Sequence, residues 1–177
     1  TGYSPDTAAQ TLRTGKVNQV GVIAPNIGSQ SVGLITEGIA RELDSKNYMV
    51  LLGNTGLDAQ RELSYLKAMQ RNHVAGIILL GCSYTPQLAQ ALQDCRVPVV
   101  VTGQRFPEVP CVYNDDCSAT RELTRLMLDR GRKKIVYIGG NEHDQAVGLL
   151  RRIGVQDALA MAGQNSEDLT RLCCTAF

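Results

Sequence analysis

The sequence lacks the long apolar runs and the excess of charge that mark several common classes of protein. None of its apolar runs approaches the ~20 residues that a membrane helix needs. Its first residues do not join a basic segment to an apolar one, as an export signal does. The formal net charge at pH 7 is only +1, so the protein is not coated with basic side chains for nucleic acid, although a small local contact surface remains open. We therefore expect a cytoplasmic protein that does not contact the membrane.

Motifs for metals, nucleotides and nucleophilic catalysis are missing as well. The six cysteines form no CxxC pair and have no zinc-like spacing to His73 or His143, so we expect reduced, mostly buried thiols and no metal site. The sequence contains neither GxGxxG nor GxxxxGK[ST], which argues against a phosphate-binding loop and a nucleotide cofactor. A GxSxG nucleophile elbow is also absent, and no nucleophile stands beside His143. The sequence therefore predicts a protein that is not an enzyme and that needs no cofactor.

Apolar runs alternate with helical patterns along most of the chain. Its 177 residues, of which 44% are hydrophobic and 20% charged, suffice for one globular domain with a real core. Extended segments are expected at Val20–Ala24, Tyr48–Gly53, Ala75–Leu80, Val97–Thr102, Cys111–Tyr113 and Lys134–Ile138. Helices are expected at Val32–Leu43, Leu57–Met69, Pro86–Asp94, Asn114–Arg130 and Ala146–Ala162. The alternation predicts an α/β fold with a doubly wound parallel sheet, whose valine- and isoleucine-rich strands are buried on both faces.

The two ends of the chain do not follow this pattern. In Thr1–Lys16, Pro5-Asp6-Thr7 is a helix start, and the helix that follows is only about two turns long before Gly15. Helices that short are marginal alone, so this one either forms on binding a partner or is a frayed tail. The last residues, Gln164–Phe177, contain one amphipathic piece at Glu167–Cys174, and no further strand is recognised.

Polar side chains collect after the predicted strands, where open α/β sheets bind their ligands. They are Asn26, Ser29, Gln30, Asn54, Ser83, Gln104, Arg105, Asp115, Asp116, Glu142, Asp144 and Arg151. Carboxylates and amides together with an arginine form paired hydrogen bonds to vicinal hydroxyls, which suits a sugar or a similar polyol. Each residue alone is also compatible with a helix cap or a solvated loop, and Asp115 or Asp116 is a good N-cap. The grouping is stronger support for a ligand site than any one member.

Several motifs resemble the LacI/GalR family of bacterial transcription regulators. Gly2-Tyr3-x-Pro5-Asp6-x-x-Ala9-x-x-Leu12, followed by Val20-Gly21-Val22-Ile23, resembles the family's hinge and first strand. The resemblance continues through Gly76–Leu79, Val97–Val100, Val112-x-x-Asp115, Gly131-x-x-Lys134-Ile135 and Arg151-x-x-Gly154-x-x-Asp157-Ala158-Leu159. Family members carry a helix-turn-helix, a hinge helix and a two-lobed effector domain shaped like a periplasmic sugar-binding protein. The resemblance therefore implies a sugar-responsive repressor that binds operator DNA.

This resemblance also implies a division of the chain. Residues 1–16 would be a hinge segment that follows a helix-turn-helix not present here. Residues 17–163 would be the N-terminal lobe of a type I periplasmic-binding-protein-like effector domain, and 164–177 the truncated start of a second lobe or a tail. The expected homodimer would form through helix Val32–Leu43 and the region Cys82–Pro86.

Site residues are carried over at matching positions. In the hinge these are Asp6, Ala9, Gln10, Leu12 and Arg13; Leu12 would wedge between base steps in the minor groove, while Arg13 and Lys16 would contact phosphates. Asp6 stands where the family usually has Asn, and Gln10 where Arg is frequent, so we expect weaker phosphate contact or a changed operator preference. Effector contacts are implied at Asn26, Gln30, Asp115 or Asp116, and Arg151. Effector binding would rotate the lobes and shift the hinge between order and disorder.

The resemblance says less about the kind of effector. The segment Glu142–Arg152, together with Asp115-Asp116, resembles trehalose-operon repressors slightly more than other members of the family. This implies a disaccharide or its phosphate, with Arg151 or Arg152 pairing with a phosphate group. The alternatives are a periplasmic-type sugar-binding protein, which would have no reason to keep the hinge-like segment, and an α/β enzyme, which would need a phosphate loop or a catalytic pair.

Overall fold

The computed structural model describes residues 17–107, 109–142, 144–165 and 169–173, so the expected hinge segment 1–16 lies outside the described residues. The chain packs as two compact units. The first takes the described residues up to Leu80 together with 90–100 and 109–110, and the second takes 81–89, 101–107 and the described residues from Cys111 onward. No helix within these ranges has both the length and the apolar character that a membrane crossing requires.

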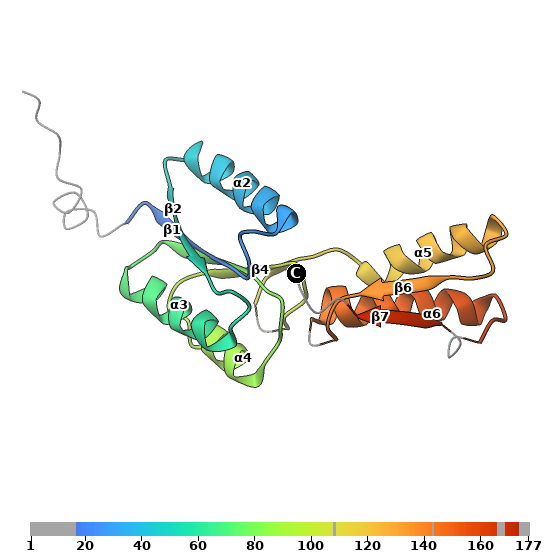
Figure 1. The fold of residues 1–177 in the computed structure, drawn as a ribbon. Coiled ribbons are helices and arrows are strands. Elements are labelled where there is room, and N and C mark those ends of the chain that lie inside the picture. Colours follow the sequence, from blue (N-terminus) through green and yellow to red (C-terminus); the bar gives the residue numbers. More distant parts are fainter. Residues whose placement is uncertain (1–16, 108, 143, 166–168, 174–177) are drawn as a thin grey trace, which may run out of the picture. The chain divides into compact units, whose positions relative to one another are not determined.

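A five-stranded sheet with the strand order β2-β1-β3-β4-β5 is the largest element of the fold (Figure 1). Its strands are β1 (Gln19–Ala24), β2 (Met49–Asn54), β3 (Gly76–Leu80), β4 (Val99–Thr102) and β5 (Cys111–Val112). β1 pairs in parallel with both β2 and β3, so that Val22 lies opposite Leu52 on one side and Ile78 on the other. β4 and β5 are also parallel. Parallel strands joined by helices confirm the predicted α/β fold.

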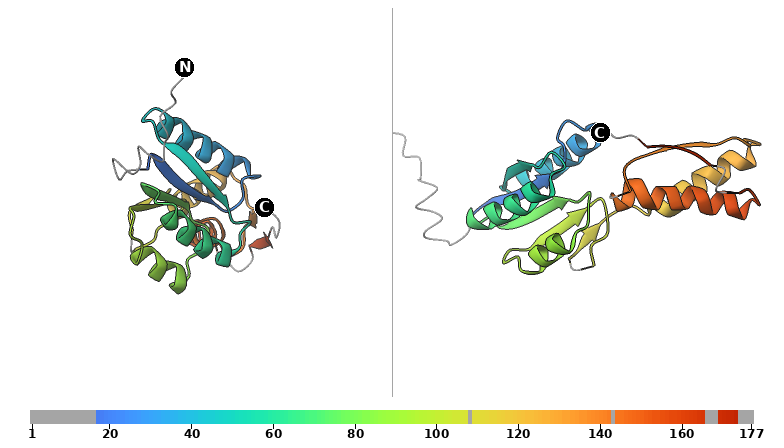
Figure 2. Two further views of the ribbon diagram at one scale, coloured as in Figure 1. Left: turned by 90° about the vertical axis from the view of Figure 1, so that its left-hand side faces the viewer. Right: turned by 60° about the horizontal axis from the view of Figure 1, so that its bottom comes forward.

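Helices cover both faces of this sheet (Figure 2). The helices of this sheet are α2 (Gln30–Asp44), α3 (Ala59–Arg71) and α4 (Pro86–Gln93). The later helices are α5 (Asp116–Asp129), η1 (Gln145–Leu150, a π-helix) and α6 (Arg151–Met161). On the α2 side, Val22 belongs to an apolar cluster with Val32 and Ile39. On the α3 side, Gly21 admits Met69, whose sulfur lies only 2.8 Å from where a Cβ at position 21 would stand. The alternation of side chains along β1 therefore directs one set to each helix layer.

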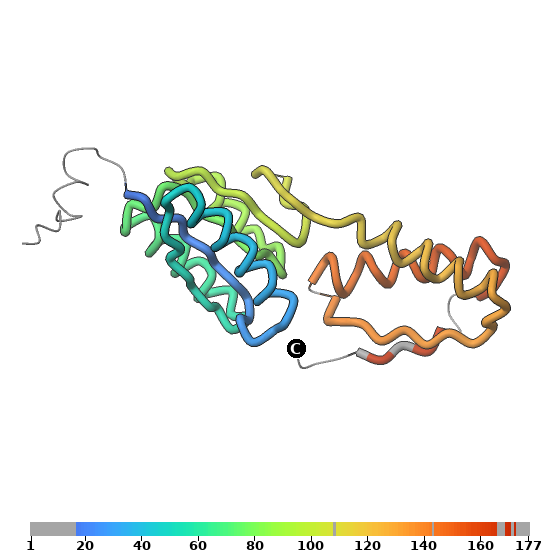
Figure 3. Tube along the Cα trace, turned by 90° about the horizontal axis from the view of Figure 1, so that it is seen from above, coloured from blue at the N-terminus to red at the C-terminus, as the bar shows by residue number. Residues whose placement is uncertain are grey.

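The strand β6 (Val136–Gly139) does not continue this sheet, which corrects the expectation of one sheet for all the β/α units. It pairs in parallel with β7 (Thr170–Cys173) in a separate two-stranded sheet. Both α5 and α6 lie on the same side of these two strands (Figure 3), where Tyr137 packs beside Val155 and Leu159. The C-terminal segment therefore contains a strand that the sequence did not predict, because its partner lies about 34 residues earlier, at Val136↔Thr170.

Burial on both faces is correct for β1 but wrong for two other strands. Five of the six residues of β1 are buried. By contrast, β2 is an edge strand, and its Met49 and Leu52 are 66% and 42% exposed. In β6, Val136 and Ile138 are more than half exposed because both helices pack on the opposite face. A valine-rich run therefore indicated a strand without indicating its place in a sheet.

A buried carboxyl lies at the start of α3. Asp58 caps this helix by accepting hydrogen bonds from the backbone of Gln60 and Arg61. One turn later, Glu62 is only 5% exposed, and its burial raises the pKa of its carboxyl to about 7. The charged form is disfavoured because burial removes the water that would solvate the carboxylate.

This burial predicts a stability that falls as pH rises. The pKa of Glu62 is higher in the folded protein than the ordinary value of 4.5, so its contribution is complete below pH 4.5 and is lost as pH rises through 7. We expect Glu62→Gln to be more stable than the parent by about 3 kcal/mol at pH 8 and nearly equal to it at pH 4. Urea unfolding at the two pH values measures the difference.

The control for this measurement is Glu42→Gln, which removes an exposed carboxyl on α2. Its hydrogen bond and charge attraction with Lys46 lower the pKa of Glu42, the opposite direction to Glu62. The control variant should therefore show no gain in stability at pH 8. An equal gain for both variants, or none for Glu62→Gln, would contradict the assignment.

Candidate functional site

The loop that follows β4 buries an amide at the carboxyl end of the sheet. Gly103 turns the chain with a φ of +92°, a value that favours glycine. The next residue, Gln104, is only 2% exposed, and neither its amide nitrogen nor its amide oxygen has a hydrogen-bond partner among the described residues. The hydroxyl of Thr102 is buried in the same way. Buried polar groups are normally paired, so this pair of residues is exceptional.

Packing around Phe106 holds this loop in place. Its ring is 1% exposed and meets Tyr84 edge to face, with the ring centroids 5.1 Å apart and the planes at 86°. The backbone of Phe106 also contacts the sulfur of Cys111, which is 3.1 Å from its nitrogen and 3.2 Å from its oxygen. Cys111, like Cys82, Cys95 and Cys117, is of intermediate exposure and not mostly buried as expected.

Two aspartates stand at the start of α5 and differ in role. Asp115 is the N-cap, and its side chain accepts a hydrogen bond of 3.0 Å from the backbone nitrogen of Ser118. That bond, supported by the Ser118 side chain, lowers the pKa of Asp115. Asp116 is the first helical residue and is 7% exposed. The predicted N-cap at Asp115 or Asp116 is therefore Asp115.

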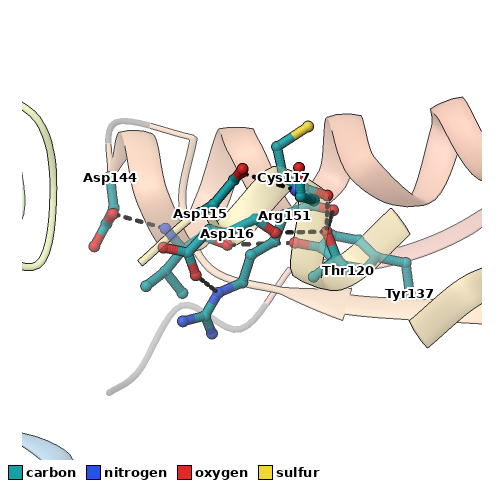
Figure 4. Close-up of polar contacts among 9 residues, drawn as sticks. Asp115, Asp116, Cys117, Thr120, Tyr137, Asp144 and Arg151 are labelled. Carbon is teal, nitrogen blue, oxygen red and sulfur yellow. Dashed lines mark hydrogen bonds and ion pairs between the residues drawn. The ribbon is translucent and has the colours of Figure 1, made fainter. Parts of the chain in front are cut away.

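Asp116 forms an ion pair with Arg151 at the start of α6 (Figure 4). The Arg151 Nε lies 2.6 Å from the Asp116 Oδ1. The two helices begin close together because Gly154 has no side chain; a Cβ there would lie 2.1 Å from the carbonyl oxygen of Cys117. The Thr120 hydroxyl, 2.9 Å from the Arg151 carbonyl oxygen, ties the same crossing. Arg151 is thus fixed through both its side chain and its backbone.

A third carboxylate caps the π-helix that leads into α6. The Asp144 side chain accepts a hydrogen bond of 2.9 Å from the Val147 nitrogen. Burial raises the pKa of Asp144, and the hydrogen bonds from the backbone of Val147 and Ala146 partly oppose that rise. Gly148 admits the close approach of Asn141, whose carbonyl oxygen lies 1.9 Å from where a Cβ would stand. π-Helical turns of this kind are often found at functional sites.

These elements surround a pocket of about 700 Å³ within the second unit. A volume of this size suits a small molecule. The lining residues come from the loop after β4, the start of α5 and η1, together with Tyr84: they are Tyr84, Gly103, Gln104, Arg105, Pro107, Tyr113, Asn114, Asp115, Asp116, Gln145, Ala146 and Leu150. Two of them are predicted effector residues, Asp115 and Asp116.

The other predicted effector residues lie elsewhere. Asn26 and Gln30 belong to the first unit; the Asn26 side chain accepts a hydrogen bond of 3.0 Å from Gly28, and Gln30 begins α2 with an exposed side chain. Their part in a site stays a prediction. Arg151 does not line the pocket, although its partner Asp116 does. Arg152, the second candidate for a phosphate contact, has its Nε 3.0 Å from the Glu142 carboxylate and donates from Nη1 to Gln156 at 2.7 Å.

Sequence reasoning did not rank Gln104 above its neighbours. The residue was one of twelve polar side chains after the strands, and nothing local distinguished it from the exposed Arg105 beside it. Two residues later, Phe106 packs on Tyr84, a long-range contact that the sequence does not indicate. Nothing in the sequence indicates that Tyr84 and Tyr113 belong to the pocket lining.

Comparisons with known proteins agree on one family. Residues 18–176 match the family described as periplasmic binding proteins and sugar binding domain of LacI family. The sucrose operon repressor of Staphylococcus xylosus is 31% identical over 153 residues, which are 86% of this chain and 48% of that protein. The chain spans about half the length of the curated relatives it matches.

Solved structures share the fold. The transcription regulator CcpA of Lactococcus lactis is 30% identical with a TM-score of 0.78, over 89% of this chain and 58% of that one. The trehalose repressor of Escherichia coli has a TM-score of 0.73 but only 18% identity, over 88% of this chain and 58% of its own. The likeness to the trehalose repressor therefore extends to the fold alone.

The unpaired amide of Gln104 predicts a gain in stability when it is removed. Gln104→Met keeps the length of the side chain and eliminates the buried donor and acceptor, so we expect the free energy of unfolding to rise by about 1 kcal/mol. Thermal and urea unfolding of the ligand-free protein measure it. The matched control is Gln145→Met, which replaces an exposed amide in the same lining and should change stability by less than about 0.5 kcal/mol. A loss of stability in Gln104→Met would mean that the amide is paired.

Proposed function

Because the chain belongs to the family of periplasmic binding proteins and sugar-binding domains of the LacI family, we propose that it is the effector-binding part of a sugar-responsive transcriptional repressor. The sucrose operon repressor and CcpA, to which it is similar, are regulators of transcription by name. The regulation of an operon by this protein and the operator DNA it binds are both part of the proposal. No catalytic step is assigned to it.

One observation carries the proposal, namely the buried amide of Gln104 in the wall of the pocket. Its nitrogen and oxygen lack partners among the described residues, yet both belong to a side chain that is 98% covered, since 2% is exposed. An amide presents one acceptor and two donors, and a sugar hydroxyl both donates and accepts. A bound sugar would therefore satisfy the atoms that the protein leaves unpaired. The Asp115 and Asp116 carboxylates in the same lining add acceptors for further hydroxyls.

The proposed partners are operator DNA, a sugar or sugar phosphate, and a second copy of the chain. Asp6, Ala9, Gln10, Leu12 and Arg13 would form the DNA-contacting hinge, which lies outside the described residues. For the homodimer, the outer side of α2 supports an interface, because Leu34 and Ile35 are 62% and 44% exposed there. The contribution expected from Cys82–Pro86 is part of the same proposed dimer interface.

The border between the two lobes of the effector domain is also proposed. The expected division places residues 17–163 in the first lobe. The separate sheet of β6 and β7, with α5 and α6 on one face, supports an earlier border near the start of α5. In that case the described residues from Asp116 onward belong to the second lobe.

The finer proposal for the effector is a disaccharide or its phosphate. It rests on the resemblance of Glu142–Arg152 and Asp115-Asp116 to trehalose-operon repressors, and the sucrose operon repressor is a second disaccharide-related relative. A periplasmic-type sugar-binding protein is the second candidate function, because the family description covers such proteins. It would bind the same sugars and no DNA.

Titration calorimetry with sucrose, trehalose, maltose and their 6-phosphates tests sugar binding by the full-length protein. We expect heat from at least one sugar and a loss of affinity on the order of tenfold in Gln104→Met, because two hydrogen bonds to the ligand are lost. The control Gln145→Met should retain more of the affinity because its amide has solvent available. No heat from any of the sugars or phosphates would remove the proposed effector class.

Leu12→Ala tests the DNA-binding role. In the full-length repressor we expect operator affinity to fall by about tenfold or more, since the wedge that unstacks and bends the duplex is lost. A gel shift with the operator fragment measures the affinity, and effector titration should be unchanged. Thr11→Ala, the neighbouring position, is the matched control and should bind operator like the parent. Unchanged operator binding in Leu12→Ala would refute the wedge, and the absence of DNA binding in the parent would favour the periplasmic-type candidate.

A further inference from the structure

Arg151, whose partner Asp116 lies in the pocket lining, is already neutralised by the protein. The Arg151 Nε is 2.6 Å from the Asp116 Oδ1, at the short end of charge-assisted hydrogen bonds. The Asp116 side chain is 8% exposed while that of Arg151 is 43% exposed. Figure 4 shows the bonded nitrogen of Arg151 directed at Asp116 and its two terminal nitrogens on the far side from that carboxylate. Asp116 is therefore part of the pocket lining, and Arg151 is not.

The helix N-termini at the pocket are also occupied. A helix N-terminus is the usual place for a phosphate, because its free N–H groups and its dipole attract anions. At α5 the Asp115 carboxylate accepts from the Ser118 nitrogen, and at η1 the Asp144 carboxylate accepts from the Val147 nitrogen. A carboxylate of the protein thus stands at each N-terminus where a phosphate would bind.

The charges that remain in the lining are mainly negative. One arginine, Arg105, is set against two aspartates, Asp115 and Asp116. Asp144 lies directly before the lining residues Gln145 and Ala146, and the charge of Asp116 adds to the rise in its pKa that burial causes. A phosphate dianion would meet these carboxylates at close range in a partly desolvated site, where juxtaposed like charges weaken binding.

We propose that the effector is an uncharged, hydroxyl-rich sugar and that Asp116, by holding Arg151 and presenting a carboxylate to the pocket, excludes its phosphorylated form. This inference rests on the proposed function as a sugar-binding regulator and narrows it. A neutral sugar has the donors that the carboxylates need and the donor–acceptor hydroxyls that the Gln104 amide lacks. A phosphate offers mainly acceptors, which suit Gln104 only in part and the aspartates not at all.

The first test compares sugars with their phosphates in the unmodified full-length protein. Titration calorimetry is done with sucrose against sucrose 6-phosphate and with trehalose against trehalose 6-phosphate at low ionic strength. We expect the neutral member of a pair to bind, and its phosphate to bind weaker by a factor on the order of tenfold or more. Tighter binding of a phosphate would overturn the inference while leaving the proposed function intact. Binding of none of the four would instead overturn the proposed effector class, on which this inference rests.

The second test changes Asp116. In Asp116→Asn the side chain keeps its size and loses its charge, so Arg151 is no longer neutralised, and we expect the ratio of phosphate to neutral-sugar affinity to rise on the order of tenfold. The matched control is Asp129→Asn on the same helix, an exposed carboxylate about 20 Å along the axis from Asp116. It removes one equal charge and should leave the ratio unchanged. An unchanged ratio in Asp116→Asn, in a protein whose circular dichroism shows it to be folded, would overturn the role of Asp116.

Discussion

The close crossing of α5 and α6 is the constraint on which the candidate site depends. Gly154 allows the helices to approach until its Cα lies beside the Cys117 carbonyl, where any side chain would collide. The approach brings the Thr120 hydroxyl to the Arg151 backbone and the Asp116 carboxylate to the Arg151 guanidinium. Asp116 and Arg151 are 35 positions apart in the sequence, and the crossing is what brings their side chains together.

That crossing also decides what kind of field the pocket has. Two helix N-termini, those of α5 and η1, would normally make an electropositive wall. Each N-terminus is capped by an aspartate, Asp115 for α5 and Asp144 for η1. Arg151 is paired with Asp116. Both helix N-termini and Arg151 are therefore neutralised within the protein, while Arg105 remains in the lining. A ligand meets this one arginine together with two aspartates and an amide that no described residue pairs, rather than a net positive charge.

The sequence was a good guide to the elements and a poor one to their long-range pairing. Apolar runs located β1 to β6 to within one or two residues, because burial in a parallel sheet requires continuous hydrophobicity. The same runs do not indicate which sheet a strand joins. The apolar pattern of β6 is similar to that of β3, yet β6 pairs with the weakly apolar β7. In the site, Asp115 and Asp116 were found through their place after β5. Arg151 was expected to contact the effector, and its ion pair with Asp116 was not foreseen because the two residues lie on different helices. Side-chain contacts between helices are not local properties of a sequence.

Buried polar groups in this chain differ in how much they say about a ligand. Glu62 is buried and its pKa is raised to about 7, but a carboxyl can lower the cost of its burial by taking up a proton. An amide does not titrate, so the cost of burying the Gln104 donor and acceptor without a partner among the described residues is the same at every pH. A shifted pKa marks a group that has adjusted to its surroundings, whereas no described residue pairs with the amide of Gln104, which leaves it for a ligand. For that reason the neutral residue, which shows no anomaly in charge, is the stronger indication of a binding site.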